Sequence, residues 1–250
     1  MSNELLNKES MLYGFEESKQ EDIVIPRIKV INALSPERVD GLAVEGDVIN
    51  SLTKEKVNDQ LFIPIKQYYS NIRWNPDRND DIRIECYSRD GRIGITNAGD
   101  TLICAECRAN QFDNTKQGKE AQPLCTSYLN FLGFFEEEVM PSVLSFSKTN
   151  YNEGKKMLSI AKSMRKSIWN YGYKLSGQKV VKDKNQWFII TAKMGGETSP
   201  EARELALELY KIYEKTVLDV DYEDVAKQKT VRRLLMLSPL KWNLKFNRLS

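Results

Sequence analysis

The residues with the clearest potential for chemistry are four cysteines, which are all the cysteines in the chain. Cys104 and Cys107 form a C-x2-C pair, while Cys86 and Cys125 flank that pair with equal gaps of seventeen residues. A C-x2-C turn can place two thiolates on one edge of a tetrahedral Zn2+ ion, and two distant cysteines can complete the coordination. The spacing predicts one structural zinc ion, because four thiolates leave no open position for water or substrate.

Two other interpretations of the cysteines remain open. Two disulfides would use the even cysteine count, although the polar start of the sequence, MSNELLNKES, lacks the pattern of a signal peptide. Small disulfide-stabilised proteins are also shorter and richer in cysteine than this chain. Free or redox-active thiols are the third interpretation.

The lack of histidine restricts the enzyme classes that this chain can belong to. A sequence with no histidine excludes Ser-His-Asp and Cys-His nucleophile systems, HExxH metalloproteases and H-x-E zinc deaminases. Carboxylates at Asp77, Asp80 and Asp81 could hold Mg2+, but the DRNDD segment is more simply a solvated turn. We therefore expect a protein that is not an enzyme.

Charge is distributed unevenly along the 250 residues, although the net charge is only +2. Residues 148–184 contain ten Lys and Arg against two acids, and residues 226–250 contain seven against none. This segregation predicts a basic face for a polyanion, with a solvated lysine-rich surface as the alternative. No apolar run approaches the length of about 18 residues that a membrane span requires, so we expect no membrane partner.

Aromatic residues are interleaved with basic ones in two parts of the sequence. Single-stranded nucleic acid requires this combination, because bases stack on exposed rings while cations neutralise phosphates. The alternative is that these rings fill a β core. Adjacent residues of a strand point to opposite faces, so Tyr68 and Tyr69 cannot both face one core. The candidates for stacking are Tyr68, Tyr69, Trp74, Trp169 and Tyr173, and those for phosphate contact are Lys66, Arg73, Lys155, Lys156, Arg165 and Lys166.

Hydrophobic periodicity predicts a mainly β protein with helices (α+β). Pro64 indicates an edge strand or a bulge. A second helix should begin at Pro200, because Ser199 offers a capping hydroxyl just before it. We expect strands at residues 23–30, 61–69, 82–88, 126–135 and 142–147, a helix at 151–168, a hairpin of 171–181 with 186–193, and a helix continuing to about residue 217.

Several segments resemble a family of bacteriophage and prophage proteins believed to bind single-stranded DNA. The resemblance covers roughly residues 23–195 and rests on IPRIKVINALSPE, GLAVEGDVINSLT, the block from ECYSRDGRIGITNAG through DTLICAEC to PLC, and PSVLSFSKT. It implies an OB-type five-stranded barrel with an inserted four-cysteine zinc loop, broadly similar in design to the helix-destabilising protein of T-even phages. It also implies a protein that coats single-stranded DNA during phage replication or recombination, in the cytoplasm of an infected bacterial host. A zinc-ribbon interaction module, acting as a replication or transcription accessory factor, is the alternative.

Three parts of the chain are expected to behave differently. Residues 1–22 should form a flexible acidic arm, residues 23–220 the OB-type core with its zinc loop at 86–125, and residues 221–250 a basic amphipathic segment. Bacterial single-strand-binding proteins end in an acidic tip that recruits partners, and this sequence does not. From Leu240 to Phe246 apolar residues alternate with polar ones, as in a strand that adds to an exposed sheet edge. Residues 231–250 are therefore expected to mediate self-association or contact with a replisome or polymerase partner, unless the strand packs on its own barrel.

Overall fold

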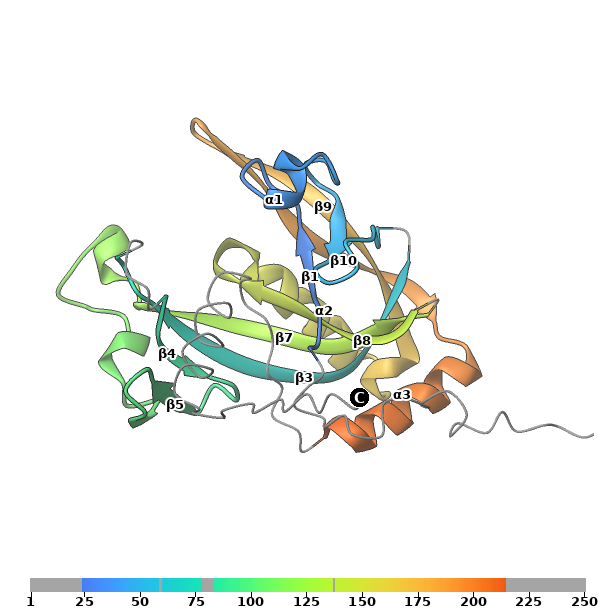
Figure 1. The fold of residues 1–250 in the computed structure, drawn as a ribbon. Coiled ribbons are helices and arrows are strands. Elements are labelled where there is room, and N and C mark those ends of the chain that lie inside the picture. Colours follow the sequence, from blue (N-terminus) through green and yellow to red (C-terminus); the bar gives the residue numbers. More distant parts are fainter. Residues whose placement is uncertain (1–23, 59, 78–82, 137, 215–250) are drawn as a thin grey trace, which may run out of the picture.

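The computed structural model describes residues 24–58, 60–77, 83–136 and 138–214, and these residues form one strongly curved sheet with helices on both faces (Figure 1). The strand order is β2-β1-β8-β7-β3-β4-β5-β6, and the hairpin of β9 and β10 joins this ladder through β3. The predicted mixture of a dominant sheet with few helices is confirmed. The predicted acidic arm at residues 1–22 and the basic segment at 221–250 lie outside the described residues.

Three antiparallel strands form the centre of the sheet: β3 (Leu61–Trp74), β7 (Cys125–Phe135) and β8 (Glu138–Ser147). The register of β3 against β7 shifts between Pro64 and Lys66, so the predicted bulge at Pro64 is confirmed. The opposite edge of β3 is shared by two partners. The hairpin strand β9 (Tyr171–Lys182) pairs with its first residues, and β4 (Ile84–Ser88) pairs with its last four.

Two smaller units extend the sheet at its ends. The cysteine module, residues 84–125, consists of β4, β5 (Ile93–Thr96), β6 (Thr101–Ile103) and two 3-10 turns at η3 (Arg108–Asn110) and η4 (Gly118–Ala121). At the other end, β1 (Arg27–Val30) runs parallel to β8 and antiparallel to β2 (Val48–Asn50), with α1 (Pro36–Val39) between β1 and β2. Sequence periodicity missed β2, β5, β6 and α1 because each has only three or four residues.

The main core fills the concave face of the sheet, and α2 (Tyr151–Ser163) packs over it. Its centre is an edge-to-face contact of Phe131 with Phe146, whose ring centroids are 6.0 Å apart, and Met157 of α2 is fully buried beside them. Gly154 lets the helix approach this closely, because a Cβ there would lie 2.8 Å from the Phe146 side chain. The helix ends at Ser163, five residues earlier than the sequence pattern predicts.

The opposite face of the central strands is covered by α3 (Pro200–Tyr213). Its small residues Ala202 and Ala206 are buried against the apolar side chains at the start of β3 and the end of β7. The Ser199 hydroxyl accepts a hydrogen bond of 3.2 Å from the Ala202 backbone N–H, which confirms the predicted N-cap. The hairpin partner β10 (Asn185–Glu197) leads directly into this helix, as the sequence pattern indicates.

The predicted OB-type five-stranded barrel is not closed, because the described strands form an open sheet. Strands β8 and β10 do not pair among the described residues, because β1 occupies the position beside β8. The gap between β1 and β10 is bridged by one side chain. The Asn32 amide oxygen accepts from the Phe188 backbone N–H at 2.7 Å, and its amide nitrogen donates to the Phe188 carbonyl at 3.4 Å. One asparagine thus substitutes for a pair of ladder hydrogen bonds.

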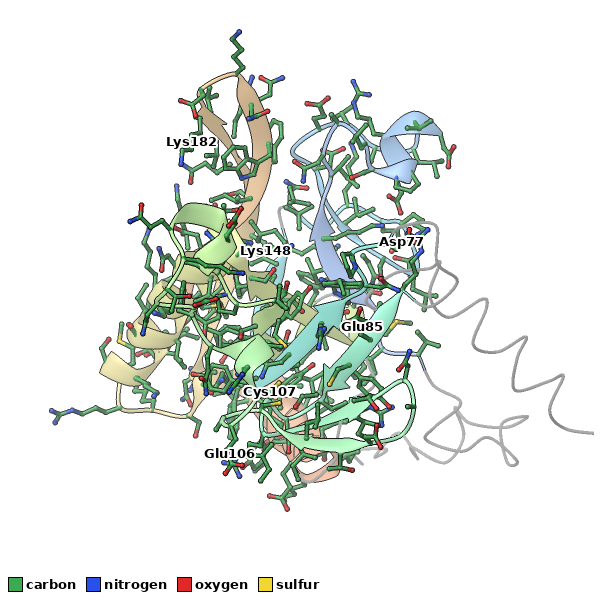
Figure 2. The ribbon with its side chains drawn as sticks, turned by 90° about the vertical axis from the view of Figure 1, so that its left-hand side faces the viewer. Asp77, Glu85, Glu106, Cys107, Lys148 and Lys182 are labelled. Atoms are coloured by element: carbon green, nitrogen blue, oxygen red, sulfur yellow. The ribbon has the colours of Figure 1, made fainter. Side chains whose placement is uncertain are left out.

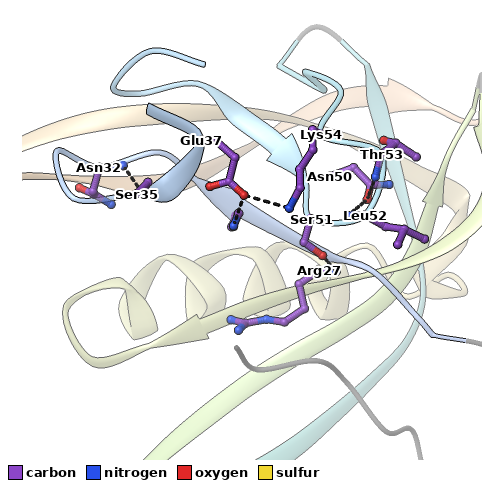
Figure 3. A network of polar contacts seen from close by, with 10 residues as sticks. Arg27, Asn32, Ser35, Glu37, Asn50, Ser51, Leu52, Thr53 and Lys54 are labelled. Atoms are coloured by element: carbon purple, nitrogen blue, oxygen red, sulfur yellow. Dashed lines mark hydrogen bonds and ion pairs between the residues drawn. The ribbon is translucent and has the colours of Figure 1, made fainter. Parts of the chain in front are cut away.

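A buried carboxylate holds the β1–β2 unit together (Figure 3). Glu37 of α1 is only 3% exposed, and its Oε1 atom lies 2.7 Å from the Lys29 Nζ and 3.0 Å from the Lys54 Nζ. Burial by itself raises the pKa of Glu37. Hydrogen bonds from Lys29, from the backbone and from Lys54 outweigh that burial and lower the pKa to about 2.

We expect Glu37→Gln to lower the free energy of unfolding by about 2 kcal/mol at pH 7, because both lysines lose their carboxylate partner. The loss stays moderate because both lysines remain partly hydrated. The carboxylate contribution is fully present above the ordinary pKa of 4.5 and is lost as the pH falls toward about 2. Urea unfolding of both proteins between pH 7 and pH 3 measures this, and the difference between them should be clearly smaller at pH 3 than at pH 7. Glu45→Gln is the matched control, because Glu45 pairs with Arg38 and is more exposed than Glu37. This substitution should cost less than about 1 kcal/mol. Equal losses in the two variants would contradict the prediction.

Candidate nucleic-acid interface

The four cysteines come from three places in the cysteine module, which are β4, the turn after β6 and the start of β7. Cys86 on β4 and Cys125 at the start of β7 are both paired with Arg73 of β3, so they lie at the same level of the sheet on either side of β3. A Cβ on Gly94 would lie 2.9 Å from the Cys86 Sγ and 3.7 Å from the Cys104 Sγ. The Cys86 and Cys104 sulfur atoms therefore lie close to the same side of β5.

Short hydrogen bonds fix the turn that carries the C-x2-C pair. The Cys104 backbone N–H donates to the Arg92 carbonyl at 2.7 Å. Asn110 donates from its side chain to the Cys104 carbonyl at 3.1 Å and from its backbone N–H to the Cys107 carbonyl at 2.9 Å. Both cysteines of the pair are thus oriented by the backbone of their own loop.

The thiols influence one another electrostatically, which identifies them as one cluster. Burial raises the pKa of Cys125 to about 11, and the charges of Cys107, Cys86 and Cys104 contribute to the same shift. The pKa of Cys86 is raised as well, first by burial and then by Cys104 and Cys107. All four cysteines are free thiols rather than disulfides.

The donor set fits zinc, but the described residues contain no group of three or more acidic or cysteine side chains already placed to hold a metal ion. Four clustered thiols are the ligands of a closed tetrahedral zinc site, and the ion would have to draw their sulfur atoms together. Zinc binding at Cys86, Cys104, Cys107 and Cys125 therefore stays a prediction. Of the alternative Mg2+ ligands, Asp77 follows β3, while Asp80 and Asp81 lie outside the described residues.

The predicted stacking residues have different environments. Tyr69 is 45% exposed at the cysteine-module half of β3, and its register against Leu129 places it on the concave face. Tyr68 lies on the opposite face beside Leu132 and Val143, which confirms that the two adjacent tyrosines point in opposite directions. Trp74 at the end of β3 is half-buried.

Two further predicted stacking residues are structural. Tyr173 is fully buried in the main core, so the prediction that it stacks on a base is wrong. Trp169 packs against Tyr210 of α3 with ring centroids 5.4 Å apart, and both rings belong to the apolar cluster beneath that helix. The interpretation of alternating aromatics as core residues is therefore correct for Tyr173. It also applies to Trp169, which is partly buried against the core.

The predicted phosphate contacts separate into engaged and available cations. Lys66 donates to the carbonyl oxygens of Tyr213 at 2.8 Å and Glu214 at 2.9 Å, and burial lowers its pKa. It stabilises the end of α3, so its assignment to phosphate contact is wrong. Arg73 is similarly engaged, because its Nε atom lies 2.6 Å from the Glu85 carboxylate.

The four remaining candidates all lie on or just after α2 and are exposed. Lys156 pairs with Glu153 at 2.6 Å, and Lys166 pairs with Glu197 at 3.0 Å. The ammonium of Lys155 lies 5.3 Å from the centre of the Tyr151 ring, and Arg165 follows the helix end in a left-handed conformation with φ of 51°. These ion pairs are solvent-exposed and can exchange for phosphate at little cost.

Sequence reasoning missed Tyr151 and the lysines of the hairpin. Burial raises the pKa of the Tyr151 phenol, and the phenol of Tyr69 raises it further, so the two hydroxyls lie within electrostatic range of each other. Beside Tyr151, an open hollow of about 590 Å³ is lined by residues of α2, including Lys155 and Ile160. The charge count of residues 148–184 contained the signal for these lysines, but the choice of candidates favoured cations next to aromatic residues.

Exposed cations that form no ion pair with a described residue lie at residue 148, on α2 and along the hairpin, and we call this set the basic face. In Figure 2, Lys182 lies at the hairpin tip, Lys148 lies below it in the middle of the view, and Cys107 lies lower still. None of the members of the basic face forms an ion pair with a described residue. These members are Lys148, Lys155, Lys179, Lys182 and Lys184.

No helix among the described residues is long and apolar enough to cross a membrane.

Comparison with known proteins places the chain in a family. Searches of curated proteins and of solved structures found no match. A family model described as Pam3 phage gp34-like protein matches residues 2–219, which confirms the predicted bacteriophage relationship. Because this match spans most of the 250 residues, the chain belongs to the Pam3 phage gp34-like protein family.

Proposed function

We propose that this phage protein binds single-stranded DNA and coats it during replication or recombination. The observation that carries the proposal is the strand order β8-β7-β3-β9-β10, with α2 between β8 and β9. This is the order of an OB-type sheet, a partly open Greek-key barrel whose second and third strands and two flanking loops bind oligonucleotides. The insertion of β1 beside β8 explains why the barrel stays open here.

Matching the strands to those of an OB-fold assigns roles to the cysteine module and to the β9–β10 hairpin. We call the concave surface between them the groove. With β3 as the first OB-type strand, the loop between the first two strands is the cysteine module. The turn between the fourth and fifth strands is the hairpin tip at Lys182. In OB-folds these are the two loops that contact nucleic acid. The cysteine module and the basic face border the same side of the molecule (Figure 2).

The chemistry between these loops suits a single strand better than a duplex. Tyr69 offers an exposed ring on the concave face, and Tyr151 lies beside it with the Lys155 ammonium over its ring. An unpaired base can stack on such rings, while a duplex hides the faces of its bases. Lys155 and the hairpin lysines would neutralise the phosphates on either side.

Zinc belongs to this proposal as a structural ion. Cys86, Cys104, Cys107 and Cys125 would hold it, and the ion would supply folding free energy to a module that has only three short strands. The chain would thereby present an ordered loop to DNA rather than a flexible one. The proposed activity is binding, with no chemical step.

A fluorescence titration of the full chain tests the proposal directly. The probe is labelled oligo-dT, and the comparison is a duplex of equal length at salt concentrations from about 50 to 200 mM. We expect micromolar or tighter binding to oligo-dT, weaker binding to the duplex, and an affinity that falls steeply with salt. Equal affinity for the two substrates, or no binding to oligo-dT, would contradict the proposed function.

Replacing the exposed ring on β3 separates stacking from charge. We expect Tyr69→Ala to weaken oligo-dT binding by about 1 to 3 kcal/mol without changing the salt dependence, because the substitution removes a ring and no cation. Tyr69→Phe is the matched variant and should bind like the wild type, since the phenyl ring still stacks. Loss of affinity in the Phe variant as well would assign the effect to the hydroxyl and reject the stacking role.

A further inference from the structure

The cysteine module carries an exposed apolar surface that neither the zinc site nor the DNA groove explains. Ile93 and Ile103 are 51% and 55% exposed, and the antiparallel register of β5 with β6 pairs them directly, so they share one face. Ile95, which is 40% exposed, lies on the same face two residues along β5. We call these three residues the isoleucine patch. Grouped aliphatic side chains of this kind mark contact surfaces.

The isoleucine patch is independent of the thiol cluster. Gly94 and Leu102 form the intervening pair and therefore point to the other face of the ribbon, where the Cys86 and Cys104 sulfur atoms approach Gly94. The isoleucines are thus free of any role in holding a metal. Strand β6 also ends the strand order of the described sheet, so its outer edge has no strand partner among those residues.

The sequence contains a segment whose pattern complements this surface. From Leu240 to Phe246, outside the described residues, four apolar side chains alternate with Lys241, Asn243 and Lys245. In an extended strand the apolar residues share one face and both lysines share the other. Two acidic residues lie near the ends of β6, Asp100 before it and Glu106 after it, and neither forms an ion pair with a described residue.

We propose that residues 240–246 of one copy dock, as an added strand, on the isoleucine patch and β6 edge of a second copy. The three isoleucines are exposed in the single chain, so the patch is accessible to a second copy. Apolar side chains of the segment extend the isoleucine surface, while its lysines lie near Asp100 and Glu106. Main-chain pairing at an open edge supplies affinity, and the alternating side chains supply specificity.

This contact is heterologous, because each copy contributes a segment at one site and a patch at another. Contacts of this type propagate into open chains unless their rotation closes a ring. The patch faces away from the thiol side of the ribbon, so a copy can engage its neighbour and a polyanion together. Self-association is expected without DNA, and its test is therefore separate from that of the proposed function.

A complementation experiment with two full-length variants tests the contact. Ile103→Lys places a charge on the patch that repels Lys241 and Lys245, and Leu244→Glu disrupts the apolar face of the segment. We expect the wild type to self-associate with increasing concentration in sedimentation velocity, and each variant alone to be monomeric. An equimolar mixture should form a 1:1 complex that grows no further, because one intact segment meets one intact patch. Wild-type protein that is monomeric at about 100 μM, or a mixture with no complex, would overturn the proposal.

Two controls keep the result interpretable if a variant is unstable. Val181→Lys changes an aliphatic residue that is 65% exposed on the hairpin, and it should self-associate like the wild type. A photo-reactive residue at position 242 of otherwise unchanged protein gives a second measurement. In a mixture of isotopically light and heavy chains, it should crosslink to the peptide containing Ile93 and Ile103 of the other copy. Crosslinks confined to one chain would show that the segment docks on its own module and would reject the contact between copies.

Discussion

Freshly reduced protein purified without chelators should contain one zinc ion per chain, and Cys107→Ser should lose both the ion and most of its thermal stability. Metal binding is coupled to folding, and structural zinc sites contribute about 10 kcal/mol or more of binding free energy in small peptides. Here the ion would hold β4, the turn between β6 and η3, and the start of β7 together through the four thiols. Elemental analysis and a thermal melt before and after chelation measure the effect, which should be the largest of any single substitution.

Thr96→Ser is the matched control for this experiment. Thr96 is paired with Cys86 across the β4–β5 ladder, so the control changes a direct neighbour of the cluster while keeping all four thiols. It should retain zinc and melt close to the wild type. Metal-free protein with an unchanged melting temperature would show that the thiols are not a zinc site.

Removing the three lysines at the hairpin tip should have the largest effect on DNA binding. For single strands the salt dependence falls by about 0.7 per lost phosphate contact, so Lys179→Ala, Lys182→Ala and Lys184→Ala together should reduce the slope by about 2. At about 0.1 M salt, a slope change of 2 corresponds to about 100-fold weaker binding. Oligo-dT titrations over a salt series measure both quantities.

A single-site comparison guards against an effect of net charge alone. Lys182→Ala should reduce the slope by about 0.7, while Lys211→Ala, an exposed lysine of α3 on another part of the surface, should leave it unchanged. The fold should tolerate all of these changes, because the hairpin lysines are exposed and form no ion pair with a described residue. Equal losses for Lys182 and Lys211 would remove the hairpin from the interface.

Features encoded by local sequence could be predicted, and features set by tertiary contacts could not. Ser199 and Pro200 specify the start of α3 through capping and backbone geometry, and Pro64 specifies a bulge because it lacks an N–H. These signals depend on a residue and its close neighbours in the chain.

The errors in the predicted interface have a common physical cause. Lys66 is close to aromatic residues in the sequence. The fold, however, brings it to the C-terminal end of α3, where it binds the carbonyl of Tyr213, a residue 147 positions later in the chain. Tyr173 alternates with exposed residues in β9, yet it faces the core because the adjoining β3 pairs with that strand. The open edge of the sheet could not be predicted for a similar reason, since β1 precedes the central strands in the chain and enters beside β8.

The length of β3 has a mechanical consequence. This single strand of 14 residues is about 46 Å long at 3.3 Å per residue, and it belongs to the hydrophobic core at one end and to the thiol cluster at the other. Tyr69 lies between the two ends on the same continuous backbone. A strand that is paired along its length bends little, so the cysteine module does not move independently of the groove. In the proposed function, the shape of the DNA-binding surface would therefore depend on whether the thiol cluster holds zinc.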